Sequence, residues 1–98
     1  MKHLIKGHYK LIKARGLIVP ETTLDQFMNK MEEEYYEVMN AYADDMVDRK
    51  TPSPDLIYEM TDLVMVVMNC FQHYGVDFKE QLLKNVAVQK QRVIHIDS

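Results

Sequence analysis

Four carboxylates stand in two pairs of matching spacing. Glu34 and Glu37 lie three residues apart, and so do Glu59 and Asp62. Residues at i and i+3 share one face of an α-helix, so each pair would project two carboxylates in one direction. Carboxylate oxygens are the ligands that Mg²⁺ and Mn²⁺ prefer. If the two pairs meet, they form a site for a divalent cation and for the chemistry that such a cation supports.

An antiparallel helical hairpin would bring the two pairs together. Residues that face each other in such a hairpin have numbers that add to a constant. Glu34 with Asp62 and Glu37 with Glu59 both add to 96, and Glu37 with Asp62 adds to 99, which places the turn at residue 48 or 49. Clustered carboxylates repel one another. No lysine or arginine lies within one helical turn of Glu59 or Asp62, so we expect a metal ion to supply the compensating charge.

Helical periodicity and terminal signals predict four α-helices, at about residues 3–15, 23–43, 54–74 and 78–92. The helix starts are marked by Thr22 or Thr23 with Asp25 or Gln26, by Ser53 with Pro54, and by Asp77 with Glu80. Gly16 and Gly75 are suited to end the first and third helices. The stretch Leu63–Met68 is apolar on every side of its helix, so this helix needs cover on more than one face. We therefore expect an all-α homo-oligomer, a dimer or a tetramer.

The length of 98 residues predicts a single domain over residues 1–98. One cysteine excludes an internal disulfide, and three isolated glycines exclude the glycine-rich loops of Rossmann and P-loop proteins. The longest apolar run has six residues, and no signal peptide is visible, which favours a cytoplasmic protein without a membrane span.

Charge is distributed unevenly along the chain, although the net formal charge is only −3. Residues 1–15 carry five basic residues and no acid, whereas residues 21–62 carry twelve acids against three bases, a balance of −9. An acidic middle is unsuited to a protein that binds DNA, because phosphate neutralisation needs a basic face. The same region suits a bound cation.

Two motifs resemble those of a known enzyme family. Residues 30–38, KMEEEYYEV, resemble the K-L-x-E-E-x-x-E-L signature of MazG-like nucleotide pyrophosphohydrolases, and residues 59–63, EMTDL, resemble its paired E-x-x-D-L. The resemblance covers roughly residues 24–92. It implies an all-α, four-helix bundle with a central antiparallel helical hairpin, and Mg²⁺-dependent hydrolysis of nucleoside triphosphates to monophosphates and pyrophosphate by a metal-activated water, with Mn²⁺ as the alternative ion.

The resemblance also assigns roles by position. Glu34, Glu37, Glu59 and Asp62 would be the metal ligands, and Glu33 would join Glu34 and Glu37 as a catalytic residue that orients water or binds a further metal. Members of the family often place a lysine and an asparagine on the last helix before its arginine, and here that stretch is residues 84–92, KNVAVQKQR. The corresponding candidates are Lys84, Gln89 and Arg92, each of which could equally be a solvated surface residue.

Two alternative functions remain. Phosphoribosyl-ATP pyrophosphohydrolase uses a similar bundle, but its motif usually places a histidine four residues after the aspartate, where this chain has Val66; we rank it second. A non-catalytic oligomeric bundle is the other, with the eight methionines as an adaptable interaction surface. Retention of all four carboxylates, two of them on an apolar helix, favours the enzyme.

Overall fold

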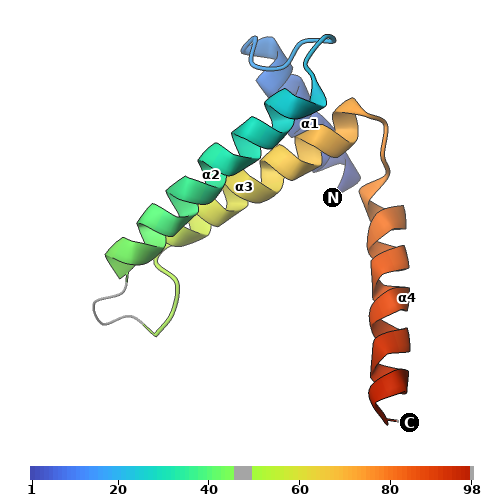
Figure 1. Ribbon diagram of the computed structural model, residues 1–98. Helices are drawn as coiled ribbons and strands as arrows, with labels where there is room; N and C mark the ends of the chain where they lie inside the picture. Colours follow the sequence, from blue (N-terminus) through green and yellow to red (C-terminus); the bar gives the residue numbers. More distant parts are fainter. Residues whose placement is uncertain (46–49, 98) are drawn as a thin grey trace.

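The computed structural model describes residues 1–45 and 50–97, which form four α-helices and no strand (Figure 1). The helices are α1 (Lys2–Ala14), α2 (Leu24–Asp45), α3 (Pro54–His73) and α4 (Phe78–Asp97). The predicted all-α class is confirmed. Every helix boundary except the end of α4 lies within two residues of its predicted position.

Side-chain caps begin the last three helices where the sequence predicted them. Thr23 and Gln26 form a reciprocal capping box: the Gln26 amide donates to Thr23 Oγ1 at 3.2 Å, and the Thr23 amide donates to Gln26 Oε1 at 2.8 Å. Ser53 accepts a hydrogen bond from the Leu56 amide at 3.1 Å, and Asp77 caps α4 in the same way. These caps fix the start of both helices that carry the paired carboxylates.

Glycines in the left-handed conformation end α1 and α3. Gly16 and Gly75 have φ angles of 74° and 67°, which side chains with a Cβ rarely adopt. After α3, the Val76 amide donates to the Phe71 carbonyl at 2.8 Å, and the Gly75 amide donates to the Gln72 carbonyl at 3.3 Å. This pair of bonds is the pattern of a Schellman motif. The chain therefore leaves each helix sharply, in a direction set by the glycine.

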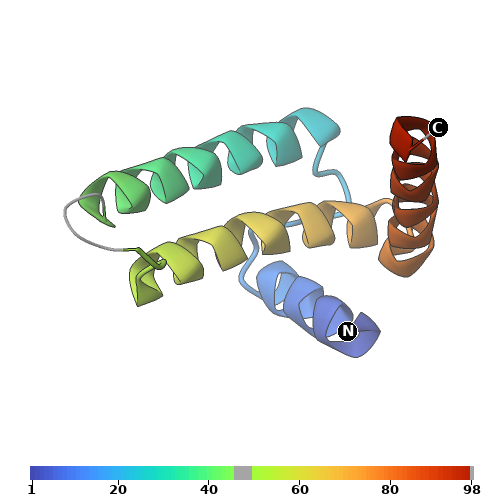
Figure 2. The ribbon, with the colours of Figure 1, turned by 90° about the horizontal axis from the view of Figure 1, so that it is seen from below.

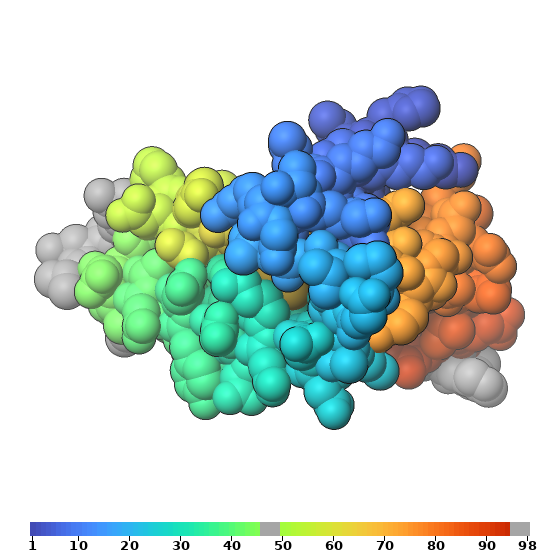
Figure 3. All heavy atoms as spheres, turned by 90° about the horizontal axis from the view of Figure 1, so that it is seen from above, coloured from blue at the N-terminus to red at the C-terminus, as the bar shows by residue number. Residues whose placement is uncertain are grey.

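The central unit is an antiparallel hairpin of α2 and α3, with α1 packed across the other side of α3 (Figure 2). From above, α1 and the segment that follows it cover the middle of the hairpin (Figure 3). A small core lies where the three helices meet; its buried members are Ile18, Phe27 and Cys70, with Tyr9, Ile12 and Met31 packed against them. The predicted hairpin is confirmed, and its predicted turn centre at residue 48 or 49 lies outside the described residues.

Three polar contacts fix α1 and the start of α2 on α3. His8 Nδ1 lies 3.2 Å from Asn69 Oδ1, and Asn69 is only 4% exposed. His73 lies between two partners: its Nε2 is 3.0 Å from the Thr22 carbonyl oxygen, and its Nδ1 is 2.9 Å from the Tyr9 hydroxyl. Since a carbonyl oxygen can only accept, Nε2 donates the hydrogen bond to Thr22, and Nδ1 forms the contact with the Tyr9 hydroxyl.

The apolar stretch Leu63–Met68 is covered from two sides, by α2 and by α1. Val64 is nevertheless 53% exposed, so this cover is incomplete within one chain. Within residues 1–45 and 50–97, no helix combines the length and apolar character needed to cross a membrane.

The last helix leaves the hairpin instead of lying alongside it. Both views of the ribbon show α4 diverging from the end of α3 (Figures 1 and 2). It also continues to Asp97, five residues beyond its predicted end at residue 92. The alternating residues after Arg92 contain no glycine or proline, so nothing in them stops the helix.

The chain is open for its size. Its radius of gyration is 16.6 Å, compared with about 13 Å for a compact domain of this length. Its accessible surface is 7950 Å², about 2,100 Å² more than the scaling for a compact monomer of this mass gives. Much of the excess is apolar: along α4, Leu82, Leu83, Val86, Val88, Val93 and Ile94 are all exposed.

Candidate active site

The structure brings Glu34, Glu59 and Asp62 together between α2 and α3. One carboxylate oxygen from each of the three lies within 4.8 Å of the other two. Glu34 is only 7% exposed, and the other two are partly buried. Three of the four predicted carboxylates therefore converge, from both helices of the hairpin, as the residue numbers predicted.

Two oxygens of this cluster are buried without a partner. Among residues 1–45 and 50–97, neither Glu34 Oε2 nor Glu59 Oε2 has a hydrogen-bond donor, and leaving a buried polar atom unpaired costs about 1–3 kcal/mol. The donor set is all carboxylate oxygen, which suits a hard cation such as Mg²⁺ or Mn²⁺. The residues thus fit a divalent metal ion, which would give both oxygens a partner.

A lysine also compensates part of the negative charge. Lys30 Nζ lies 3.2 Å from Glu34 Oε1 and 3.3 Å from Glu33 Oε2, although the sequence led us to expect a metal ion alone. Burial acts to lower the pKa of Lys30, but its hydrogen bonds to Glu34 and Glu33 outweigh burial, so this pKa is raised. No lysine or arginine lies within one helical turn of Glu59 or Asp62 along α3. Lys30 reaches the cluster from α2, one turn before Glu34.

Glu37 lies beside the three-carboxylate cluster but outside it. The negative charge of Glu34 is the largest cause that raises the pKa of the Glu37 carboxyl, followed by desolvation and by the charge of Glu59. Glu37 and Glu59 also line an acidic pocket of about 630 Å³ that includes Asp44 and Asp55. Glu37, the fourth predicted ligand, is therefore close enough for the charges of the cluster to raise its pKa.

A second pocket, also of about 630 Å³, opens on the side covered by α1. Its lining includes Glu34 and Asp62 from the cluster, Lys30 and the exposed Glu33 from α2, and Arg15 from the end of α1. This volume lies in the range of small-molecule sites. We call it the α1 pocket. It joins the carboxylate cluster to two cationic side chains that could bind an anionic ligand.

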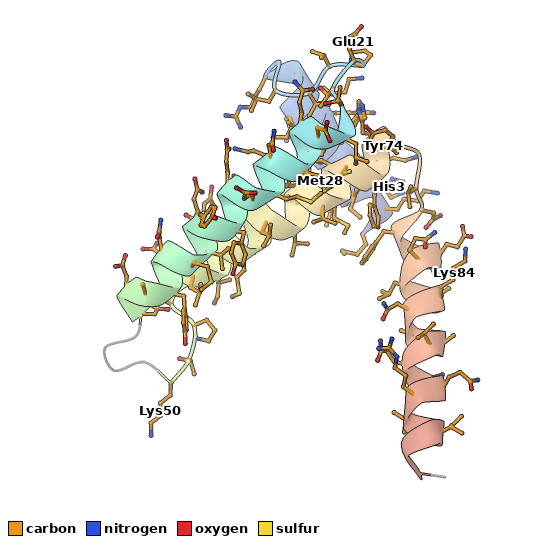
Figure 4. The ribbon with its side chains drawn as sticks, viewed as in Figure 1. His3, Glu21, Met28, Lys50, Tyr74 and Lys84 are labelled. Carbon is orange, nitrogen blue, oxygen red and sulfur yellow. The ribbon has the colours of Figure 1, made fainter. Side chains whose placement is uncertain are left out.

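The predicted phosphate contacts on α4 lie elsewhere. Lys84 stands on α4 away from the hairpin and forms an ion pair with Glu80 on its own helix, at 3.3 Å (Figure 4). Gln89 and Arg92 are exposed further along the same helix. Within one chain, none of the three lines the α1 pocket.

Sequence reasoning did not assign Arg15 or Lys30 to the site. Lys30 was visible as the first residue of the signature, and Arg15 as part of the basic segment 1–15. Neither signal shows which element faces the carboxylates, because α1 reaches them only through tertiary packing.

Comparison with known proteins places the chain in a family. A sequence model of the family described as phosphoribosyl-ATP pyrophosphohydrolase (PRA-PH) matches residues 10–89. This range includes the cluster, the α1 pocket cations Arg15 and Lys30, and most of α4. No curated protein and no solved structure matches the chain significantly.

Proposed function

Since the chain belongs to the phosphoribosyl-ATP pyrophosphohydrolase family, within the all-α MazG-like superfamily of hydrolases that act on phosphoric anhydrides, we propose that it converts phosphoribosyl-ATP and water to phosphoribosyl-AMP and pyrophosphate. This reverses the ranking drawn from the sequence, which placed a general nucleoside triphosphate pyrophosphohydrolase first because of Val66. A match over residues 10–89 outweighs that one position.

The observation that carries the proposal is the carboxylate cluster itself. Glu34, Glu59 and Asp62 offer three oxygens within 4.8 Å, two carboxylates of the cluster have an unpartnered buried oxygen, and the cluster faces a pocket of nucleotide size. Mg²⁺ bound there would neutralise phosphate charge and activate the attacking water. A purely structural role would leave the cost of these buried carboxylates unexplained.

The side chains around the cluster take separate roles in this proposal. Glu34, Glu59 and Asp62 hold the metal, and Glu37 provides the fourth carboxylate from the acidic pocket that it lines with Glu59. Glu33, which is exposed at the α1 pocket, orients the attacking water. Lys30 keeps the Glu33 and Glu34 carboxylates in place through its two ion pairs.

The test is a turnover assay with Mg²⁺, measuring pyrophosphate from phosphoribosyl-ATP and from a panel of standard and modified dNTPs. We expect phosphoribosyl-ATP to be the best substrate. Asp62→Asn should reduce kcat/KM by about 100-fold or more, because even changes to residues that only orient metal ligands cost about 10- to 100-fold. Glu32→Gln is the matched control, since Glu32 is an exposed acid on α2 outside the cluster.

The possible outcomes separate the candidates. Faster turnover of a dNTP than of phosphoribosyl-ATP would favour the general nucleotide pyrophosphohydrolase. No turnover of any substrate, or an unaffected Asp62→Asn variant, would contradict the assignment of this site.

We further propose a homo-oligomer in which α4 of one copy packs against another. The excess surface of about 2,100 Å² per chain is more than enough for a stable interface, which buries about 800 Å² on each partner. The exposed apolar residues of α4 support this packing. In such an assembly Lys84, Gln89 and Arg92 would approach the carboxylates of a neighbouring copy.

Analytical ultracentrifugation tests the assembly, and Leu83→Glu should dissociate it because it buries a charge in the interface. Mixing inactive Asp62→Asn with inactive Arg92→Gln tests whether the site is shared. Recovered activity in the mixture would support α4 contributing across the interface, and a monomeric wild-type protein would contradict the proposal.

A further inference from the structure

Among the described residues that line the α1 pocket, Arg15 and Lys30 are the arginine and lysine, and Arg15 has no acidic partner. The other cation there, Lys30, is engaged with Glu33 and Glu34. Arg15 makes no hydrogen bond or ion pair through its side chain within the described part of the chain. It is thus an available guanidinium in the lining of the pocket that Glu34 and Asp62 also line.

The position of Arg15 is set by the way α1 is held. Arg15 is the C-terminal cap residue of α1, and its own amide bonds back to the Leu11 carbonyl at 3.1 Å. The helix is fixed on α3 through the contacts of His8 and Tyr9 described above. The guanidinium therefore extends from an anchored helix end, and not from a free terminus.

The pocket is elongated along the hairpin. Its lining runs along α2 from Gln26 to Glu34, which at 1.5 Å per residue is about 12 Å. A metal ion held by the carboxylates would occupy one part of this length, and room would remain for a second anionic group of the same ligand. Arginine suits that group, because its planar fork gives two parallel hydrogen bonds to phosphate oxygens.

We propose that Arg15 binds a phosphate group of the nucleotide substrate from the α1 side of this pocket. The inference rests on the proposed function. Phosphoribosyl-ATP carries two sources of such a group: the triphosphate that is cleaved and the phosphate monoester on its second ribose. Both present phosphate oxygens to the guanidinium, and the two are separated by experiment.

The experiment is isothermal titration calorimetry with Mg²⁺ present, using three ligands that cannot be hydrolysed to pyrophosphate: phosphoribosyl-AMP, AMP and pyrophosphate. Arg15→Gln should weaken by about 10- to 100-fold the ligand whose phosphate the guanidinium binds, as expected for charge-assisted hydrogen bonds. A loss for phosphoribosyl-AMP without a loss for AMP assigns Arg15 to the second ribose phosphate. A loss for pyrophosphate assigns it to the leaving group.

Matched variants keep the result interpretable. Lys10→Gln removes the same charge from an exposed position on α1 that does not line the pocket, and it should leave all three affinities unchanged. Arg15→Lys keeps the charge without the fork and should give an intermediate affinity. Because Arg15 is exposed, Arg15→Gln should leave the melting midpoint within a few degrees of wild type.

Equal affinities of Arg15→Gln and wild type for all three ligands would overturn the proposal. Failure of the proposed function has a different signature: wild-type protein that binds these ligands but does not hydrolyse phosphoribosyl-ATP. The affinity comparison for Arg15 stands in either case.

Discussion

Binding of Mg²⁺ should stabilise the fold, because the folded chain holds a carboxylate cluster whose charges are only partly compensated. Lys30 reaches one oxygen of Glu34, while Glu34 Oε2 and Glu59 Oε2 are buried without a hydrogen-bond partner in the part of the chain that the structure describes. The unfolded chain has no such cluster, since Glu34 is far in sequence from Glu59 and Asp62 and only helix packing brings them together. A ligand that binds the folded state alone raises the free energy of unfolding.

The magnitude follows from mass action. At a Mg²⁺ concentration one hundred times Kd, binding contributes about 2.7 kcal/mol. For a domain of about 100 residues, each kcal/mol moves the melting midpoint by about 4–8 °C. We therefore expect Tm to rise by about 10–20 °C.

The assay is thermal unfolding followed by circular dichroism at fixed protein concentration, with MgCl₂ titrated from an EDTA-treated sample. NaCl at matched ionic strength separates binding from screening. Glu59→Gln should lose most of the Mg²⁺ response, whereas Glu32→Gln, outside the cluster, should keep it. A wild-type Tm that Mg²⁺ leaves unchanged, or equal responses of both variants, would contradict metal binding at the cluster.

Three further predictions concern individual side chains. Repulsion from Glu34 raises the Glu37 pKa above its ordinary value of 4.5, so ionisation of Glu37 destabilises the folded state. This destabilisation is absent below pH 4.5, where Glu37 is protonated in both states, and complete above the raised pKa. In EDTA, Glu37→Gln should therefore raise Tm at pH 7 and change it little at pH 4, and equal shifts at both pH values would contradict this cause. Thr23→Ala removes the α2 cap and should cost about 1 kcal/mol in urea unfolding, without changing Mg²⁺ affinity. Phe27 is 4% exposed, and its ring centroid lies 5.1 Å from that of His73. Phe27→Ala should lower the free energy of unfolding, measured in urea, by about 3–5 kcal/mol. A decrease below about 1 kcal/mol would show that the core closes around the cavity.

Local sequence signals predicted the helices well because each signal acts within a few residues. Thr23 with Gln26 and Ser53 with Leu56 form their caps across three residues, and the glycines need only their own φ angles. The end of α4 was wrong because it lacks such a signal: the residues after Arg92 neither cap nor break a helix.

The carboxylate site was predictable because, in an antiparallel helical hairpin, the residue numbers show which positions of the two helices face each other. Glu34 meets Glu59 and Asp62 because two antiparallel helices with a predicted turn centre leave few alternative registers. Arg15 belongs to a different case. It reaches the same pocket through packing of α1 on α3, which depends on contacts such as His8 with Asn69, 61 residues apart.

The sequence by itself determined four helices, the hairpin, and the convergence of three carboxylates, since periodicity, caps and antiparallel geometry are local or nearly local properties. Only the tertiary structure decided which cations share the pocket with those carboxylates, and that α4 with Lys84 and Arg92 lies apart from them in a single chain. The physical reason is that helix packing brings together residues that are far apart in the sequence. It does so through apolar surface and a few hydrogen bonds, and no local sequence signal identifies which residues will pair.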